Sequence, residues 1–303
     1  FTPLADGACQ TVDELAAVLG VPTRRLRMLL DSLAANGLLV VDQSDRFTNS
    51  AVANQFLVKG RPQYMGGSYE LYRDMFATVL STAASVRAGT PAALHDWERM
   101  HEDELRALLR GLNSGAAAHG RMLAARHDFA RFKSVLDVGG GGGGLAMGVC
   151  QSSPGVAAQV IELPAVARIS DELLAAAGLQ ARIRSVSHDI TMAPLPETHD
   201  AAVLRNFLQV LPTERACRAV ENVGRSLRPG GEVFIIGIVL DDDRRGPAGA
   251  HALNLFFLNA FPDGQAYTES EHRAWLAAAG FADITRSPFP GMDHSLMTAQ
   301  KPG

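Results

Sequence analysis

The chain has little cysteine, few aromatic residues and no apolar run long enough to span a bilayer. Its three cysteines lie far apart among 303 residues, so their spacing fits neither a disulfide framework nor a zinc site. We therefore expect a reducing, cytoplasmic compartment, no membrane insertion and no bound metal. Because the chain begins with Phe1 instead of Met, we also expect an N-terminal segment to be missing.

An excess of positive charge is also absent. The chain has 28 basic and 32 acidic residues, a formal net charge of −4, which argues against a general nucleic-acid or membrane-surface binder. A hydrophobic content of 47% is sufficient for one or two domains with substantial cores.

The most informative segment is a short apolar run followed by six glycines. Residues 135–138 read as a buried strand, Gly139 to Gly144 as a tight loop, and the next residues as a helix. Such a loop lets the backbone approach a nucleotide-type cofactor. The glycines match the dinucleotide fingerprint, with Glu162 placed to hold a ribose, whereas Asp137 inside the strand suits a cationic sulfonium ligand.

After this loop, strands and helices alternate, which predicts a parallel sheet with helices on both faces. Strands are expected at 156–161, 183–186, 201–205 and 232–239, and further ones at 281–285 and 296–299. Ligands bind beyond the carboxyl ends of such strands, and the charged residues predicted there are Asp137, Glu162, Asp189 and Arg205.

The N-terminal part reads as a winged helix. Helices are expected from Thr11 and from Pro22, then a hairpin over 38–48. This pattern raises the hypothesis of a transcriptional regulator, with three arginines of the second helix facing DNA: Arg24, Arg25 and Arg27. The domain is not strongly basic, so we favour a solvated face and expect no nucleic-acid partner. Helical segments are then expected at 64–88, 95–111 and 112–126.

Several sequence motifs, in a characteristic order, resemble those of a known family. They are V-L-D-V-G-G-G at 135–141, I-E-L-P at 161–164, S-H-D-I at 187–190, L-R-P-G-G at 227–231 and the run at 267–281. The chain resembles the winged-helix S-adenosylmethionine-dependent O-methyltransferases of the caffeate and acetylserotonin type, bacterial branch. The resemblance implies an α/β fold with a Rossmann-like class I methyltransferase sheet of seven strands, the last antiparallel. It also implies an all-α winged-helix dimerisation domain over 1–126, a catalytic domain over 127–303, and a homodimer.

The same resemblance implies a cofactor site for S-adenosyl-L-methionine. Gly139 and Gly141 would line its methionine moiety, and Glu162 stands where the family usually has an aspartate that grips the ribose. Asp189 and Ile190 would contact the adenine, and Arg205 would lie near the carboxylate tail or the adenine rim.

The departures from the family concern catalysis. Gln209 stands where many members have a catalytic histidine, and Gly237 and Ala266 stand where two glutamates orient it. An amide is no base near neutral pH. His294, ahead of the last strand, and His251 are the candidate replacements, ranked above His119; otherwise the acceptor is already ionised or carbon-centred. The phrase H-D-W at 95–97 precedes the loop, and we interpret it as a helix start and not as the base.

The helix that begins near His251 would also supply acceptor contacts through Asn254 and Phe257, within a set of apolar residues that could equally be core: Phe207, Leu253, Phe256, Phe261 and Met292. The sequence therefore predicts a methyltransferase acting on a hydrophobic or aromatic small molecule in secondary or pigment metabolism, with O-methylation favoured. One alternative is a member with a non-methylating reaction, a decarboxylase, hydroxylase or cyclase. A winged-helix regulator ranks third.

Overall fold

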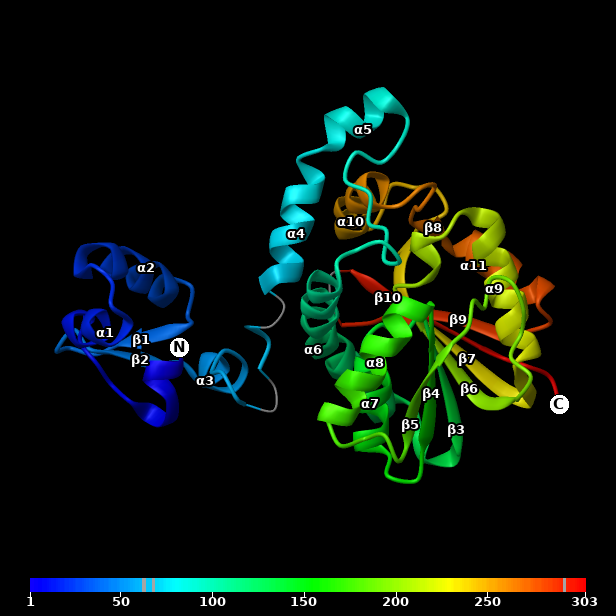
Figure 1. Cartoon of the computed structure of the whole chain (residues 1–303), viewed down its shortest axis with the longest axis horizontal. Helices are drawn as coiled ribbons and strands as arrows, with labels where there is room; N and C mark the ends of the chain where they lie inside the picture. Colours follow the sequence, from blue (N-terminus) through cyan, green and yellow to red (C-terminus); the bar gives the residue numbers. More distant parts are fainter. Residues whose placement is uncertain (62–63, 67–68, 291–292) are drawn as a thin grey trace. The chain divides into compact units, whose positions relative to one another are not determined.

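The computed structural model describes residues 1–61, 64–66, 69–290 and 293–303, so the expected pocket residue Met292 lies outside it (Figure 1). The chain forms two compact units, Phe1–Tyr69 and Glu70–Gly303. Each is described separately below.

The smaller unit has the expected winged-helix elements. They are η1 (Thr2–Gly7), α1 (Val12–Leu19), α2 (Thr23–Ala35), β1 (Leu39–Val41), β2 (Phe47–Asn49) and α3 (Ala51–Phe56). Thr11 and Glu14 form the capping box that starts α1, and β1 pairs with β2 as an antiparallel hairpin. Apolar side chains from both helices and the hairpin, among them Leu30 and the fully buried Phe47, form one core.

Of the three arginines considered for DNA contact, Arg27 is held within this unit. Its guanidinium donates to Asp31 at 2.8 Å and also pairs with Asp45, while Arg24 and Arg25 are exposed. Arg27 is therefore engaged by carboxylates and is not a free cation on the helix surface.

The larger unit begins with helices and continues as an alternating α/β sheet. The helices before the sheet are α4 (Tyr69–Val79), α5 (Thr82–Ala88), α6 (Glu102–Arg126) and the short η3 (Phe129–Arg131). The elements that follow are β3 (Ser134–Val138), α7 (Gly144–Ser152), β4 (Ala157–Glu162), α8 (Pro164–Ala176), β5 (Ile183–Ser187), β6 (His199–Arg205), η4 (Leu208–Val210), α9 (Thr213–Arg225), β7 (Leu227–Leu240), α10 (Ala248–Ala260), β8 (Tyr267–Thr268), α11 (Glu269–Ala278), β9 (Ala282–Pro288) and β10 (His294–Gln300).

The sheet confirms the predicted topology. Its order is β5-β4-β3-β6-β7-β10-β9, with only the last strand in sequence, β10, antiparallel to its neighbours. A two-residue strand, β8, pairs with β7 as an eighth member that the sequence did not reveal. Strand β7 also starts earlier than expected, at Leu227, with a register irregularity before Glu232.

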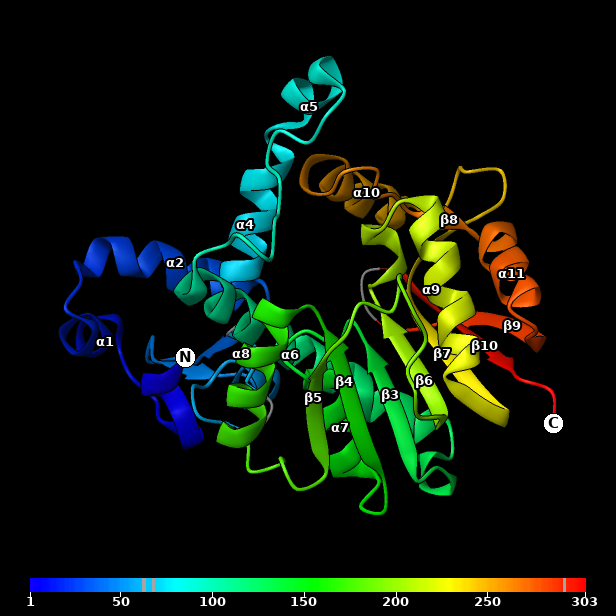
Figure 2. The same cartoon turned by 45° about the vertical axis from the view of Figure 1, so that its right-hand side comes forward.

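Successive strand residues point to opposite faces of the sheet and pack into two separate cores, as expected for a sheet covered on both faces. One core lies under α9 and α11 and the other under α6, α7 and α8, and Figure 2 shows α9 and α7 on opposite sides of the strands. The first core takes Leu136, Val138, Ile161, Ala202, Leu204, Val233 and Ile235, and the second takes Val135, Ala158, Val160, Ala201, Val203, Phe234 and Ile236.

The helices before the sheet differ from the expectation in three ways. The segment expected at 64–88 is divided into α4 and α5, with a turn at Leu80 and Ser81. Residues 95–101 form turns, and α6 starts at Glu102, where His101 accepts a hydrogen bond from the Asp103 backbone. The expected break at Gly111 is wrong, because α6 runs unbroken to Arg126.

Helix α6 packs closely along α7. A Cβ at Gly120 would lie 2.3 Å from the Leu145 carbonyl oxygen, so the missing side chain allows this contact. This packing makes α6 part of the larger compact unit, which begins at Glu70. Among the described helices, none combines the length and apolar character needed to cross a bilayer.

Candidate active site

The six-glycine loop connects β3 to the N-terminus of α7 at the carboxyl edge of the sheet. Gly139 and Gly141 adopt positive φ angles of 61° and 58°, which favour glycine. A Cβ at Gly139 would lie 2.3 Å from the Phe207 ring, so a side chain would collide there. Asn113 of α6 clamps the loop, because its amide donates to the Gly142 carbonyl at 3.0 Å and accepts from the Gly144 N–H at 3.2 Å.

Asp137 lies beneath this loop and has no solvent exposure. Its Oδ2 accepts from the Ala146 N–H at 3.1 Å, at the start of α7, while its Oδ1 has no hydrogen-bond partner among the described residues. Burial raises the pKa of Asp137 to about 7, and the Ala146 hydrogen bond and the nearby Arg205 charge oppose that rise. Asp137 thus ties the loop to the helix that follows it.

Glu162 ends β4 beside the loop. Its carboxylate accepts from the Gly141 N–H at 2.8 Å and from the Leu163 N–H at 3.1 Å. The side chain keeps some contact with solvent, yet desolvation raises the pKa of Glu162 to about 7 despite these two donors. The carboxylate is therefore poised to change its charge near neutral pH.

Asp189 and Ile190 follow β5 and have different surroundings. The Asp189 carboxylate accepts from Thr191 at 2.6 Å and from Arg215 at 2.9 Å, so it is already engaged by protein donors. Ile190 is 3% exposed and belongs to the core under α9, where its carbonyl accepts from Asn222.

Arg205 ends β6 without an ion pair to any described carboxylate. Its Nε donates to Nδ1 of His119 at 3.0 Å, which leaves the proton of the neutral imidazole on Nε2. Desolvation lowers the pKa of Arg205 to about 10, and burial with the Arg205 charge lowers the pKa of His119 to about 3. The guanidinium therefore carries a positive charge that no described carboxylate balances, and it donates a hydrogen bond to a neutral histidine.

Asn206 connects two of the predicted catalytic positions. Its Oδ1 accepts from Gln209 Nε2 at 3.0 Å and lies 3.1 Å from His294 Nε2. The Nδ1 of His294 is buried without a partner among the described residues, and burial followed by the Arg205 charge lowers the pKa of His294 to about 4. The His294 and His119 rings meet edge to face with centroids 5.2 Å apart.

The positions without their usual glutamates lie at the same edge. A Cβ at Gly237 would be 3.1 Å from Gln209 Oε1, so residues 209 and 237 are direct neighbours. Ala266 is fully buried and donates its N–H to Asn254 Oδ1 at 2.8 Å. Neither residue carries a carboxylate that could orient a base.

The helix α10 residues divide into polar and apolar members. Phe257 is buried in a cluster with Leu253, to which Val210, next to Gln209, also belongs. Asn254 is occupied by the Ala266 N–H, while His251 is half-buried and makes no hydrogen bond with a described residue. The structure thus joins Arg205, His119, His294 and Gln209 in one array, which does not include His251.

These features fit a cofactor that carries both a cation and an anion. At most positions of the glycine loop a side chain would collide with a neighbour, the Asp137 and Glu162 carboxylates lie beside the loop, and Arg205 has no carboxylate partner among the described residues. Residues 77–282, more than half of the chain, match the protein family described as the O-methyltransferase domain.

The chain belongs to this family. It is an S-adenosylmethionine-dependent methyltransferase, as its motifs predict. Among curated relatives of this O-methyltransferase, one from Streptomyces sahachiroi, a 3-hydroxy-5-methyl-1-naphthoate 3-O-methyltransferase, is 32% identical over 94% of this chain and 83% of the relative. An acetylserotonin O-methyltransferase from Mus musculus molossinus is 31% identical over 95% of this chain and 79% of the relative.

Solved structures agree on the fold. Human N-acetylserotonin methyltransferase, solved in complex with S-adenosylmethionine, superposes with a TM-score of 0.83 at 23% identity, over 100% of this chain and 90% of that one. The fold that the resemblance implied is therefore confirmed over the whole chain.

Sequence reasoning missed three residues that shape the site. Asn113 lies on a helix far from the loop it clamps, and Arg215 comes from the helix after β6, so no local spacing indicates either contact. Asn206 offered a weak signal, because an asparagine directly after a strand tolerates the positive φ of 52° that it adopts.

Proposed function

We propose that this O-methyltransferase methylates a hydroxyl group of a hydrophobic, aromatic small molecule in secondary or pigment metabolism. The observation that carries the proposal is the His294–Asn206–Gln209 array beside the buried aromatic residues of α10. The names of the two relatives, a hydroxynaphthoate and an acetylserotonin methyltransferase, support an aromatic acceptor.

The cofactor contacts in this proposal follow the site geometry. Gly139 and Gly141 leave room for the methionine part, Glu162 accepts from the ribose hydroxyls, and Arg205 pairs with the carboxylate tail. Asp189 and Ile190 border the adenine, and Asp137 holds the loop while adding negative charge under a sulfonium. Bound S-adenosylmethionine supplies an electrophilic methyl group.

In the same proposal, His294 replaces the family's usual base. Its Nε2 donates to Asn206, which leaves the Nδ1 lone pair free to accept a proton from the acceptor hydroxyl. The low pKa of His294 keeps the imidazole neutral at pH 7, and an anion paired with Arg205 would remove one cause of that lowering. Gln209 then positions Asn206, and His119 positions Arg205.

The test compares single-turnover rates of His294→Gln and His251→Gln with an aromatic hydroxyl acceptor, with the product identified by mass. We expect a loss of about 10²–10⁴-fold for His294→Gln, the usual contribution of a general base, and little change for His251→Gln. Unchanged rates in both variants would show that neither histidine is the base and that the acceptor reacts as an anion or through carbon.

A second candidate function, a reaction other than methyl transfer, is favoured by the loss of a base at Gln209 and of both carboxylates at Gly237 and Ala266. Cofactor binding with no labelled methyl group in any product would support it over the first.

We further propose a homodimer. Tyr72 and Phe76 of α4 and Leu80 just beyond it, spaced by four residues, are 45%, 71% and 85% exposed. Large apolar side chains repeated along one helical face are typical of a surface covered by a partner. A reducing, cytoplasmic setting is in keeping with three free thiols at Cys9, Cys150 and Cys217.

A further inference from the structure

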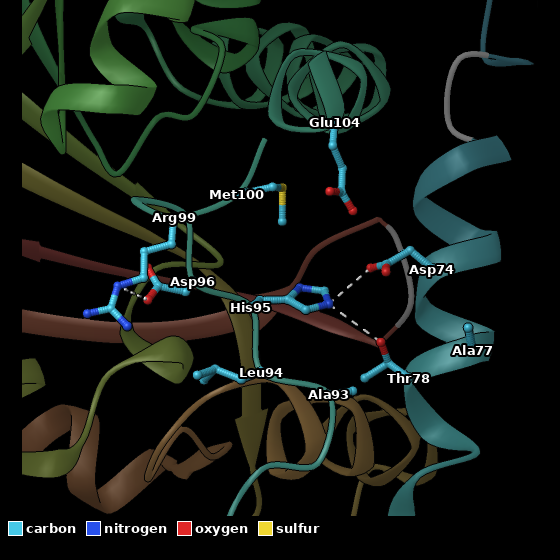
Figure 3. A pocket seen from close by; sticks show the side chains of 10 residues that line it. All are labelled: Asp74, Ala77, Thr78, Ala93, Leu94, His95, Asp96, Arg99, Met100 and Glu104. Carbon is cyan, nitrogen blue, oxygen red and sulfur yellow. Dashed lines mark hydrogen bonds and ion pairs between the residues drawn. The ribbon is translucent and has the colours of Figure 1, made fainter. Parts of the chain in front are cut away.

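A cavity of about 440 Å³ lies between α4, the turn segment before α6 and the first turn of α6 (Figure 3). Its polar lining consists of Asp74, Thr78, His95, Asp96, Arg99 and Glu104, and the remaining wall is apolar. This volume falls within the range of small-molecule sites and suits a ligand of two or three fused rings. The cavity lies wholly within the larger compact unit.

His95 is a largely enclosed polar side chain of this cavity, with 9% exposure, and Thr78 beside it is 3% exposed. Phe256 of α10 and Phe261, directly after that helix, contact its ring edge to face, with centroids 5.4 and 5.9 Å away. Its Nε2 lies 3.3 Å from Asp74 Oδ2 and 3.5 Å from the Thr78 hydroxyl. The other ring nitrogen, Nδ1, makes no hydrogen bond with a described residue and faces the side where Met100 and Glu104 lie (Figure 3).

The charges around His95 are unbalanced. Arg99 is 88% exposed and lies 3.5 Å from Asp96, and Figure 3 shows this pair away from Asp74 and Glu104. Glu104 points toward the cavity and forms no ion pair with a described residue, and Asp74 Oδ2 is shielded from solvent without a hydrogen bond. Among the described residues that line it, the region around His95 thus offers hydrogen-bond acceptors and negative charge, and its one arginine is paired with Asp96.

This cavity is connected to the reaction site by shared packing. Phe256 and Phe261, which contact His95, belong to the cluster that contains Val210, next to Gln209. Trp97 joins that same cluster to the one containing Leu109, which approaches Gly141 of the cofactor loop. The cavity and the array therefore border the same cluster of side chains.

Building on the proposed function, we infer that the cavity holds the end of the acceptor remote from its reacting atom, and that it selects aromatic acceptors bearing hydroxyl groups against those bearing a carboxylate. A neutral hydroxyl donates to His95 Nδ1, while Nε2 of the same ring lies against Asp74 and the Thr78 hydroxyl. A carboxylate placed there faces Asp74 and Glu104 without a balancing cation, which costs binding energy by like-charge repulsion. The chain would then differ from its naphthoate-methylating relative in the substrates that it binds.

Calorimetric titration in the presence of saturating S-adenosylhomocysteine tests this inference with two probes, a naphthalenediol and the matching hydroxynaphthoate. We expect the diol to bind at least about tenfold more tightly to the wild-type protein. Glu104→Gln should bring the hydroxynaphthoate several-fold closer to the diol, because one repelling charge is gone. His95→Ala should weaken the diol, and His95→Asn, which keeps an acceptor near the Nδ1 position, should restore part of the loss.

The matched control is Asp103→Asn, which removes the same charge from the neighbouring position of α6, outside the cavity. Equal binding of both probes, binding of neither, or the same shift in selectivity from Asp103→Asn as from Glu104→Gln would overturn the inference. Titration of S-adenosylmethionine in the same preparation distinguishes a failure of the acceptor inference from a failure of the proposed function. If that ligand binds but probe selectivity is absent, only the acceptor inference fails; if it does not bind, the proposed function itself fails.

Discussion

At the scale of single residues, Asp137 and Glu162 are acids that folding withdraws from water without an ion pair to any described residue. Both pKa values rise to about 7, above their unfolded values of 3.8 and 4.5. The native state therefore binds more protons than the unfolded state between these limits, so stability falls as pH rises through this window. The full penalty, roughly 1.4 kcal/mol per unit of pKa shift, applies above it.

The first prediction concerns Asp137→Asn, which removes the ionisable group at Asp137 and leaves that of Glu162. We expect the free energy of unfolding of the wild type to fall between about pH 5 and about pH 8, and the variant to show a clearly shallower fall. Urea denaturation of the cofactor-free protein at both pH values measures this difference. Parallel curves for the two proteins would mean that Asp137 is ionised throughout.

The second prediction concerns Glu162, whose ionised carboxylate is proposed to accept from the cofactor ribose. Binding of S-adenosylmethionine should weaken as pH falls below about 7, where the carboxylate gains a proton. Glu162→Gln should bind about 10–100-fold more weakly, as expected for losing hydrogen bonds to a charged group, and should lose this pH dependence. Glu162→Asp, the residue usual in the family, is the control and should keep most of the affinity. If Glu162→Gln bound S-adenosylmethionine with wild-type affinity, Glu162 would not contact the cofactor.

Some residues of the site could be predicted from the sequence, and others could not. Asp137, Glu162 and Arg205 were predictable because Asp137 lies one residue before the end of its strand and the other two end theirs, and parallel strands have their carboxyl ends at one edge. Asn113 and Arg215 were not, because their partners are distant in sequence and only tertiary packing brings them together.

At the scale of elements, the contact between α6 and α7 depends on missing side chains. A Cβ at Gly148 would lie 2.2 Å from the Ala117 carbonyl oxygen, although alanine is the better helix former. The third prediction is that overpacking outweighs propensity, so that Gly148→Ala destabilises by about 1–3 kcal/mol in chemical denaturation. Gly155→Ala, with open space around its Cβ position, serves as the control and should change little.

The same contact explains which elements could be predicted. The strands were visible because both of their faces are buried, so each reads as a short, nearly continuous apolar run, and this pattern is local. The unbroken α6 was not, because glycine ends helices in isolation but permits close approach in a packed protein, and the sequence alone does not distinguish the two roles.

At the scale of the whole molecule, the exposed apolar face of α4 should decide the oligomeric state. The fourth prediction is that the wild type sediments as a dimer and that Phe76→Glu with Leu80→Glu sediments as a folded monomer, because two charges replace the contact. Met192→Glu changes another residue that is 72% exposed and should leave the dimer intact. A monomeric wild type would contradict the proposed homodimer.

The most direct test of the central claim is a calorimetric titration of the wild-type protein with S-adenosylmethionine, S-adenosylhomocysteine and NAD. The glycine loop, the carboxylates beneath it and Arg205, which forms no ion pair with a described carboxylate, predict micromolar binding of the first two ligands and none of NAD. Binding of NAD alone would contradict the account and make the loop a dinucleotide site.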